Sequence, residues 1–359
     1  MKLDGCGPEP RKRNNPWLTR VQILIGLGLM VYLLKSASPG DIFNLLKQSV
    51  NNWPWLVIGI ILPGCGLLIA ALRWKILLGA HSFKVNLASL LEGLLVATYF
   101  NQFFPSTVGG DVARSWWVVK KGNFDSKLQM ELSLTIVLLD RVLGIAAILS
   151  VGFLSIYFSP ILMDQLAGFF VLPVIMVLVG IITLPLLKRT KAFCNSGLAS
   201  TPFGKFLNGV LSPMFETSLV IRNHKMVALW AFCLSISIQI LIIIHYIILT
   251  KMLGLNVPVW EFSTIIPIVS LLTLMPITIN GIGLREGTLA FLGGGLGLAI
   301  GEAVALGLIF MMIGLVYGFT GCIIFLRKKN KTQQLEKEGL SNVEFRCNEG
   351  ILGHPSHRS

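Results

Sequence analysis

Long apolar segments separated by short polar or basic stretches dominate the chain. Two of them, residues 87–106 and 262–300, are interrupted by Pro and Gly, which break helices. Six others have the length and composition of membrane-spanning helices. They are residues 18–34, 55–72, 132–158, 166–187, 227–250 and 302–326. The pattern predicts an all-α polytopic membrane protein with about six spanning helices and two broken or re-entrant helical segments.

Positive charges gather on one side of this predicted membrane domain. We assume that each broken segment enters and leaves the membrane on the same side. The segments on one face are then residues 1–20, 73–84, 114–127, 188–226 and 327–359. This face holds most of the Lys and Arg residues, so by the positive-inside rule it is cytoplasmic and both termini lie inside. We expect a multi-pass protein of the cell membrane.

The same assignment makes the two broken segments enter from opposite faces. This is the arrangement of an inverted repeat, in which two re-entrant segments meet near the middle of the bilayer. A full crossing by residues 87–114 would remove the inversion. The stretch Ser115–Glu131, which follows the first break, is too polar for lipid and is expected to run along the membrane interface.

The chain divides into three parts on these grounds. They are a basic cytoplasmic N-terminus (1–17), a transmembrane domain (18–328) and a cytoplasmic tail (329–359). The tail has few residues to bury, so we expect it to be disordered. The transmembrane domain consists of two halves, about 18–158 and 166–328, and the second half includes a basic cytoplasmic loop, 188–226.

Composition supports a membrane protein and excludes several other classes. The chain is 54% hydrophobic and only 13% charged, whereas soluble domains have about 25% charged residues. The net charge of +13 does not indicate nucleic acid binding, because the charges flank apolar spans. The six cysteines have no metal-binding spacing, and no nucleotide-binding loop or hydrolase motif is present. We therefore expect no metal, no cofactor and no enzymatic activity.

The two breaks repeat the same residues in the same register. Each has a proline, Pro105 or Pro276, followed by Thr two positions later, Gly five positions later and Arg nine positions later. The arginines stand where a helix would begin again after the break. A helix N-terminus with free N–H groups binds anions, and Arg grips a phosphate with two hydrogen bonds. The residues expected to bind a lipid phosphate are Arg114, Arg285, Thr107, Gly109, Gly110, Thr278, Gly281 and Gly283.

A second interpretation of each arginine stays open. Arg114 and Arg285 could each pair with a neighbouring acid, Asp111 or Glu286, and so have a structural role only. Charges inside apolar segments are costly unless they are paired or face water. The charges expected to form a buried network, or to contact a substrate, are Glu92, Asp111, Asp140, Arg141 and Glu286.

These motifs are similar to those of a known family. The run Pro105-Ser-Thr-Val-Gly-Gly-Asp-Val-Ala-Arg114, the pair Asp140-Arg141 and the run Gly281-Ile-Gly-Leu-Arg285-Glu286 resemble the lysylphosphatidylglycerol synthase transmembrane family over about residues 15–328. The resemblance implies two inverted halves with re-entrant segments. It also implies a flippase that moves aminoacylated phosphatidylglycerol between leaflets, while a separate soluble domain makes that lipid.

The resemblance leaves the cargo open. The chain has about 30 residues after its last predicted span, so the soluble transferase domain of the longer relatives is not expected. Stand-alone relatives occur beside glycosyltransferases, which adds glycolipids and polyprenyl lipids to the possible cargoes. We expect a lipid flippase, with a separate synthase or glycosyltransferase and a second copy of the chain as further possible partners.

Two other functions remain as alternatives. The first is a lipid-modifying transferase with Asp111 or Glu286 as general base. The second is a non-catalytic membrane partner of a glycosyltransferase or synthase, which would dock on the basic loop 188–226.

Overall fold

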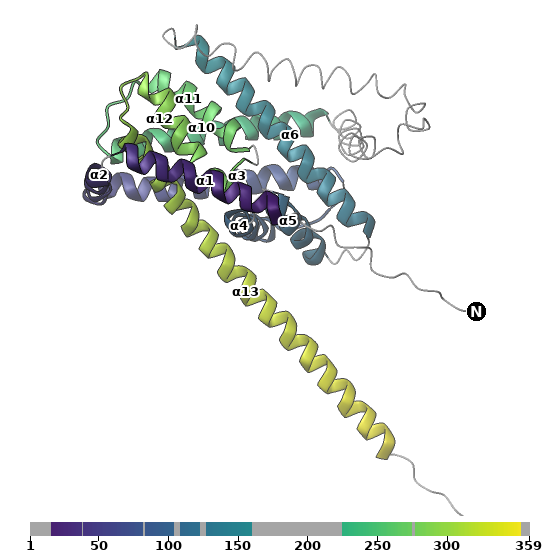
Figure 1. Cartoon of the computed structure of the whole chain (residues 1–359). Coiled ribbons are helices and arrows are strands. Elements are labelled where there is room, and N and C mark those ends of the chain that lie inside the picture. Colours follow the sequence, from purple (N-terminus) through teal and green to yellow (C-terminus); the bar gives the residue numbers. More distant parts are fainter. Residues whose placement is uncertain are drawn as a thin grey trace, which may run out of the picture.

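The structure is a computed structural model that describes most of the membrane domain. The described ranges are residues 16–37, 39–81, 83–103, 108–122, 127–159, 225–274 and 277–352. Within them every regular element is a helix (Figure 1). The predicted span 166–187 and nearly all of the loop 188–226 lie outside the described residues, as do Pro105, Thr107 and Pro276.

In the described ranges, four helices are long and apolar enough to cross a membrane. They are α3 (Trp53–Gly79), α6 (Lys127–Tyr157), α10 (Lys225–Met252) and the first part of α13 (Ile300–Leu352). Each coincides with a predicted span. The prediction of an all-α polytopic membrane protein is therefore confirmed.

The first predicted span has a different form from the others. It is part of α1 (Pro16–Ser36), which is followed at once by α2 (Pro39–Asn51), a helix that the apolar pattern did not predict. The two helices meet at an angle of 93° and together would make a fifth span. The bend falls next to Pro39, whose ring favours a helix start and forces the preceding residue away from helical geometry.

Each broken segment forms a hairpin of two short helices. The first contains α4 (Leu87–Phe103) and α5 (Val108–Lys121). The second contains α11 (Val259–Leu274), a single turn η3 (Ile279–Gly281) and α12 (Leu284–Gly294). At about 1.5 Å per residue these helices are shorter than the roughly 30 Å apolar core of a bilayer. They are therefore the arms of re-entrant segments.

The arm α5 returns along α4, so the prediction that the chain runs along the interface after the first break is wrong for this helix. Gly110 lies against α4, where an added Cβ would be 2.7 Å from the Ala97 carbonyl oxygen, and Trp117 packs against Gly93. The polar residues of α5 are accommodated because their charges are paired inside the protein, as described below.

The two hairpins enter from opposite faces, and α13 shows this directly. Lys328, near the end of its apolar part, forms an ion pair with Glu92 near the start of α4. Gly314, further back along α13, lies beside Gln102 at the end of α4. The second hairpin joins the opposite end of α13, because α12 ends only a few residues before Ile300. The inverted repeat is thus present in the fold.

The last helix continues into the part of the tail that the structure describes, and the disorder expected for the tail stays a prediction. The backbone of α13 stays helical to Leu352, and its C-terminal part leaves the bundle (Figure 1). We expected disorder from residue 329 because little can be buried there. The stretch Lys331–Glu338 is nevertheless rich in Gln, Leu, Glu and Lys, which are good helix formers.

Candidate functional site

The arginine of the first break is already bound by acids. Arg114 Nη2 lies 3.0 Å from Asp111 Oδ1, one turn earlier on α5, and its Nη1 lies 3.0 Å from Asp140 Oδ2 on α6. The guanidinium also lies over the ring of Trp74, 5.4 Å from its centroid. The side chain is 7% exposed. Pairing with Asp111, which the sequence left open as an alternative, is therefore present at Arg114.

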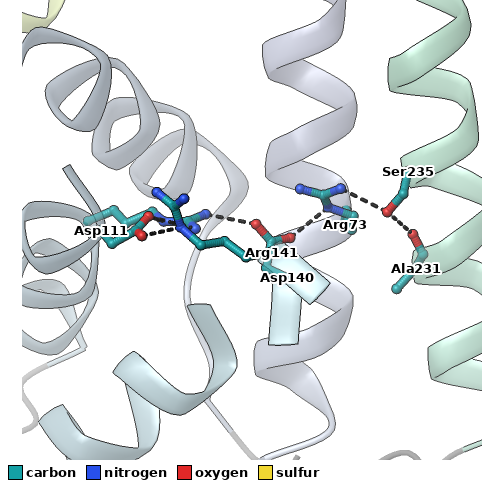
Figure 2. A network of polar contacts seen from close by, with 7 residues as sticks. Arg73, Asp111, Asp140, Arg141, Ala231 and Ser235 are labelled. Carbon is teal, nitrogen blue, oxygen red and sulfur yellow. Dashed lines mark hydrogen bonds and ion pairs between the residues drawn. The ribbon is translucent and has the colours of Figure 1, made fainter. Parts of the chain in front are cut away.

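The network extends across four helices. Asp140 binds a second arginine through the 2.6 Å contact of its Oδ1 with Arg73 Nε on α3. Arg73 Nη1 donates to Ser235 Oγ on α10, at 2.8 Å. Arg141 pairs with Asp111. Figure 2 shows the contacts running from Asp111 through Asp140 and Arg73 to Ser235.

This network joins predicted and unpredicted residues. Asp111, Asp140 and Arg141 were expected to take part. Glu92 and Glu286 were also expected, but Glu92 pairs with Lys328 and Glu286 accepts from the Gly283 N–H instead. Arg73 and Ser235 were missed. Arg73 follows an apolar span and looked like a positive-inside charge, and a lone Ser on an apolar helix carries no sequence signal.

The second break is built from left-handed backbone. Asn280, Gly281 and Gly283 all have positive φ, at 52°, 74° and 79°. Gly283 also needs to lack a side chain, because an added Cβ would lie 2.8 Å from the Gly26 carbonyl oxygen on α1. The glycines predicted to bind phosphate thus shape the break that brings the chain back into α12.

Glu286 caps the helix that follows. Its Oε2 accepts a hydrogen bond of 2.7 Å from the Gly283 backbone N–H, so it neutralises the free N–H end of α12. Glu286 is fully buried, and its Oε1 has no hydrogen-bond partner in the described part of the chain. Among the described ion pairs none joins it to Arg285, so the alternative of a local pair does not hold at this break.

Arg285 has a different environment from Arg114. The side chain is 7% exposed, and Nη2 donates to the Asn280 carbonyl oxygen at 3.2 Å. The guanidinium lies 4.5 Å from the ring centroid of Phe310 on α13. No carboxylate lies within ion-pair distance of it in the described ranges. A guanidinium offers five N–H donors, so most of its hydrogen-bonding capacity is not used by these contacts.

The two breaks touch each other. Asn280 Nδ2, in the second break, donates to Gln102 Oε1 at the end of α4. Thr278 is buried next to the turn that contains Asn280, and its Oγ1 has no hydrogen-bond partner among the described residues. Sequence reasoning did not include Gln102 or Asn280 among the site residues, because amides near a break usually satisfy local backbone groups.

Asn280 gives a first testable prediction. Both Asn280→Gly and Asn280→Ala remove the contact with Gln102, but only alanine places a Cβ in the left-handed conformation. We expect Asn280→Ala to be less stable than Asn280→Gly by about 1–2 kcal/mol. Thermal unfolding of the two purified variants measures this difference. Equal stability would mean that the turn relaxes to an ordinary conformation.

A comparison with known families fits this architecture. The family model described as the lysylphosphatidylglycerol synthase TM region matches residues 20–321. The chain belongs to this family. The resemblance inferred from the two motifs is therefore confirmed, and so is a lipid-related function in a membrane. No curated protein and no solved structure matches the chain.

The family match covers both breaks and both hairpins. Residues 20–321 include every predicted site residue and the helices of both hairpins that the structure describes. Both arginines lie within the matched region. Arg114 is bound by two acids, whereas Arg285 is bound by none that the structure describes.

Proposed function

We propose that this protein translocates a phospholipid, or a related lipid with a phosphate, between the two leaflets, and that Arg285 binds the phosphate. The observation that carries the proposal is the environment of Arg285. A buried guanidinium needs an anionic partner to offset the loss of its hydration. The described residues give Arg285 one carbonyl and one aromatic ring but no acid.

The guanidinium, and not the end of α12, is the group that we assign to the phosphate. Glu286 already occupies the Gly283 N–H, so the helix N-terminus is capped from within the chain. Arginine forms bidentate hydrogen bonds with phosphate oxygens, and these bonds are strong where water is excluded. The position of Arg285 at the meeting point of two re-entrant hairpins suits a lipid headgroup in transit through the middle of the membrane.

An apolar cavity at the same break supports a lipid as the substrate. It measures about 500 Å³ and lies among α1, α11, α12 and the start of α13. Its lining includes Gly283 and Leu284 at the break and Leu29 and Leu33 on α1. Acyl chains need such an apolar surface while the headgroup crosses. The cavity therefore offers a place for a hydrocarbon chain close to the proposed phosphate site.

The first break has another part in this proposal. Arg114 is neutralised by Asp111 and Asp140, so we assign it to holding α5 against α3 and α6. The contact between Gln102 and Asn280 then positions the first hairpin against the second. Thr278 lies in the same turn as Asn280, and we assign its free hydroxyl oxygen to the lipid path together with Arg285.

Reconstitution into liposomes tests this function. Fluorescent phospholipids are placed in both leaflets, and dithionite then quenches the outer leaflet. We expect fluorescent lipid of the inner leaflet to become accessible to dithionite faster in liposomes with the wild type than in empty liposomes. Arg285→Gln should slow this by about ten- to a hundredfold, because it removes charge-assisted hydrogen bonds to the phosphate. Arg285→Lys should keep part of the activity.

Arg20→Gln is the matched control, because Arg20 is exposed near the start of α1 and the same charge is lost. It should flip lipid at the wild-type rate. Wild-type flipping in correctly folded Arg285→Gln would contradict the assignment of the phosphate. Translocation itself would be contradicted if liposomes with the wild type lost the protected fluorescence no faster than empty liposomes. This comparison is made with lipids of several headgroups. A new lipid product made by the purified protein would instead indicate a transferase.

A further inference from the structure

A second apolar cavity is lined in part by Phe310. It measures about 280 Å³ and lies among α3, α4, α10 and α13. Its lining is largely aliphatic and includes Leu62, Leu67, Leu241 and Ile313. An apolar cavity of about 150 Å³ already binds a benzene molecule. This cavity therefore has room for a longer hydrocarbon group.

One buried polar side chain in the lining of this cavity, His245, has a ring nitrogen without a hydrogen-bond partner among the described residues. His245 is 5% exposed, and its Nε2 has no hydrogen-bond partner among the described residues. The ring contacts the backbone of Gly59 on α3. The available backbone group there is a carbonyl, which only accepts, so the other ring nitrogen, Nδ1, is the donor. In a neutral imidazole this makes Nε2 an acceptor.

The other polar groups of the cavity are acceptors as well. Thr98 Oγ1 donates its hydrogen to the Leu94 carbonyl oxygen at 2.9 Å, and the Tyr317 hydroxyl donates to the Ile60 carbonyl oxygen. Each hydroxyl has therefore used its only donor and keeps lone pairs. None of the described residues that line the cavity is an Asp or Glu. This described lining thus offers no counter-charge for a cationic ligand.

We infer that this cavity is a binding site for a long-chain alcohol, a hydrocarbon or isoprenoid chain whose terminal hydroxyl donates a hydrogen bond to His245 Nε2. The aliphatic walls recognise the chain, and the acceptors recognise a neutral donor. A plain acyl chain or an ether would leave Nε2 unpaired. This site goes beyond the proposed phosphate site, since it uses neither Arg285 nor the second break.

Photoreactive probes in protein-containing liposomes test the inference. One probe is a long-chain alcohol with a diazirine in its chain, and the other is its methyl ether, which has the same chain but no donor. Mass spectrometry identifies the labelled peptides. We expect the alcohol to label the cavity walls on α3, α10 and α13 about fivefold more than the ether. This is the ratio of affinities that one ordinary hydrogen bond produces.

Two variants separate the hydrogen bond from the cavity. His245→Phe keeps an aromatic ring but removes the acceptor, so both probes should label these walls equally. Gly66→Leu fills the cavity from α3, where an added Cβ meets no atom within 4 Å, and should abolish wall labelling by both probes.

Three outcomes would overturn the proposal. Equal labelling by alcohol and ether in the wild type would show a hydrocarbon cavity that does not select a hydroxyl. A preference for the alcohol that persists in His245→Phe would place the hydrogen bond elsewhere. Unchanged wall labelling in Gly66→Leu would place both probes outside the cavity. The wild-type comparison and Gly66→Leu still decide the matter if His245→Phe does not fold.

Discussion

Asp140→Asn should lower the free energy of unfolding by about 3–5 kcal/mol, the range found when one member of a buried ion pair is removed. Asp140 is 4% exposed and binds Arg73 and Arg114 at once. An asparagine in its place carries no charge, and its NH2 group only donates, so it cannot accept from the second guanidinium. Both guanidinium groups would then remain buried with less compensation. The measurement is thermal and denaturant unfolding of the purified protein in detergent.

Two further variants show whether the loss of stability comes from the buried ion pairs of Asp140. Asp41→Asn makes the same substitution at an exposed position on α2 and should leave stability unchanged within about 0.5 kcal/mol. Combining Asp140→Leu with Arg73→Met removes two opposite charges, so it should be more stable than Asp140→Leu alone. Similar unfolding of Asp140→Asn and the wild type would mean that the arginines find other partners and that the network does not hold these helices together.

Gly321→Ala is expected to have the second large effect. Gly321 is the position where α13 comes closest to α4, and an added Cβ there would overlap the backbone carbonyl group of Leu95. A backbone atom cannot rotate away as a side chain can, so the two helices must move apart. We expect a loss at the upper end of the roughly 1–3 kcal/mol that overpacking costs. Unfolding in detergent measures it.

Gly301→Ala, on the same helix, is the matched control. The nearest atom to its added Cβ lies 3.9 Å away, which is an ordinary contact. Alanine is also the better helix former by about 0.5–1 kcal/mol, so this variant should be as stable as the wild type or more so. Equal stability of Gly321→Ala and Gly301→Ala would contradict the close approach of α13 and α4.

The sequence predicted the parts of the fold that depend on patterns within one segment. Apolar runs located α3, α6, α10 and α13, and the Pro and Gly positions located the two breaks. The opposite entry of the hairpins followed from the number of predicted spans between the breaks, with each break assumed to return on its own side, and the charge bias agreed with that assignment. The cytoplasmic location of the termini stays a prediction, as do the cell membrane and the docking of a separate synthase.

Contacts between distant segments could not be predicted in the same way. Nothing near Arg73 indicates that Asp140 and Ser235 will lie beside it. The repeat made Arg114 and Arg285 look equivalent, yet the residue three positions before Arg114 is Asp111 and the matching position before Arg285 is Ile282. That difference gives the first arginine an acid one turn earlier on its own helix, whereas the second has no ion-pair partner among the described residues.

The helix α13 contacts the end of α4, contacts Arg285 through Phe310, and lines the cavity that contains His245. Its face toward α4 carries Gly314, Gly318 and Gly321. Glycines present no side chains, so the backbone of α4 can approach α13 closely at these positions. The first hairpin therefore packs directly on α13, while the second hairpin contacts the same helix through Arg285 and Phe310. One helix thus fixes the spacing between the two hairpins.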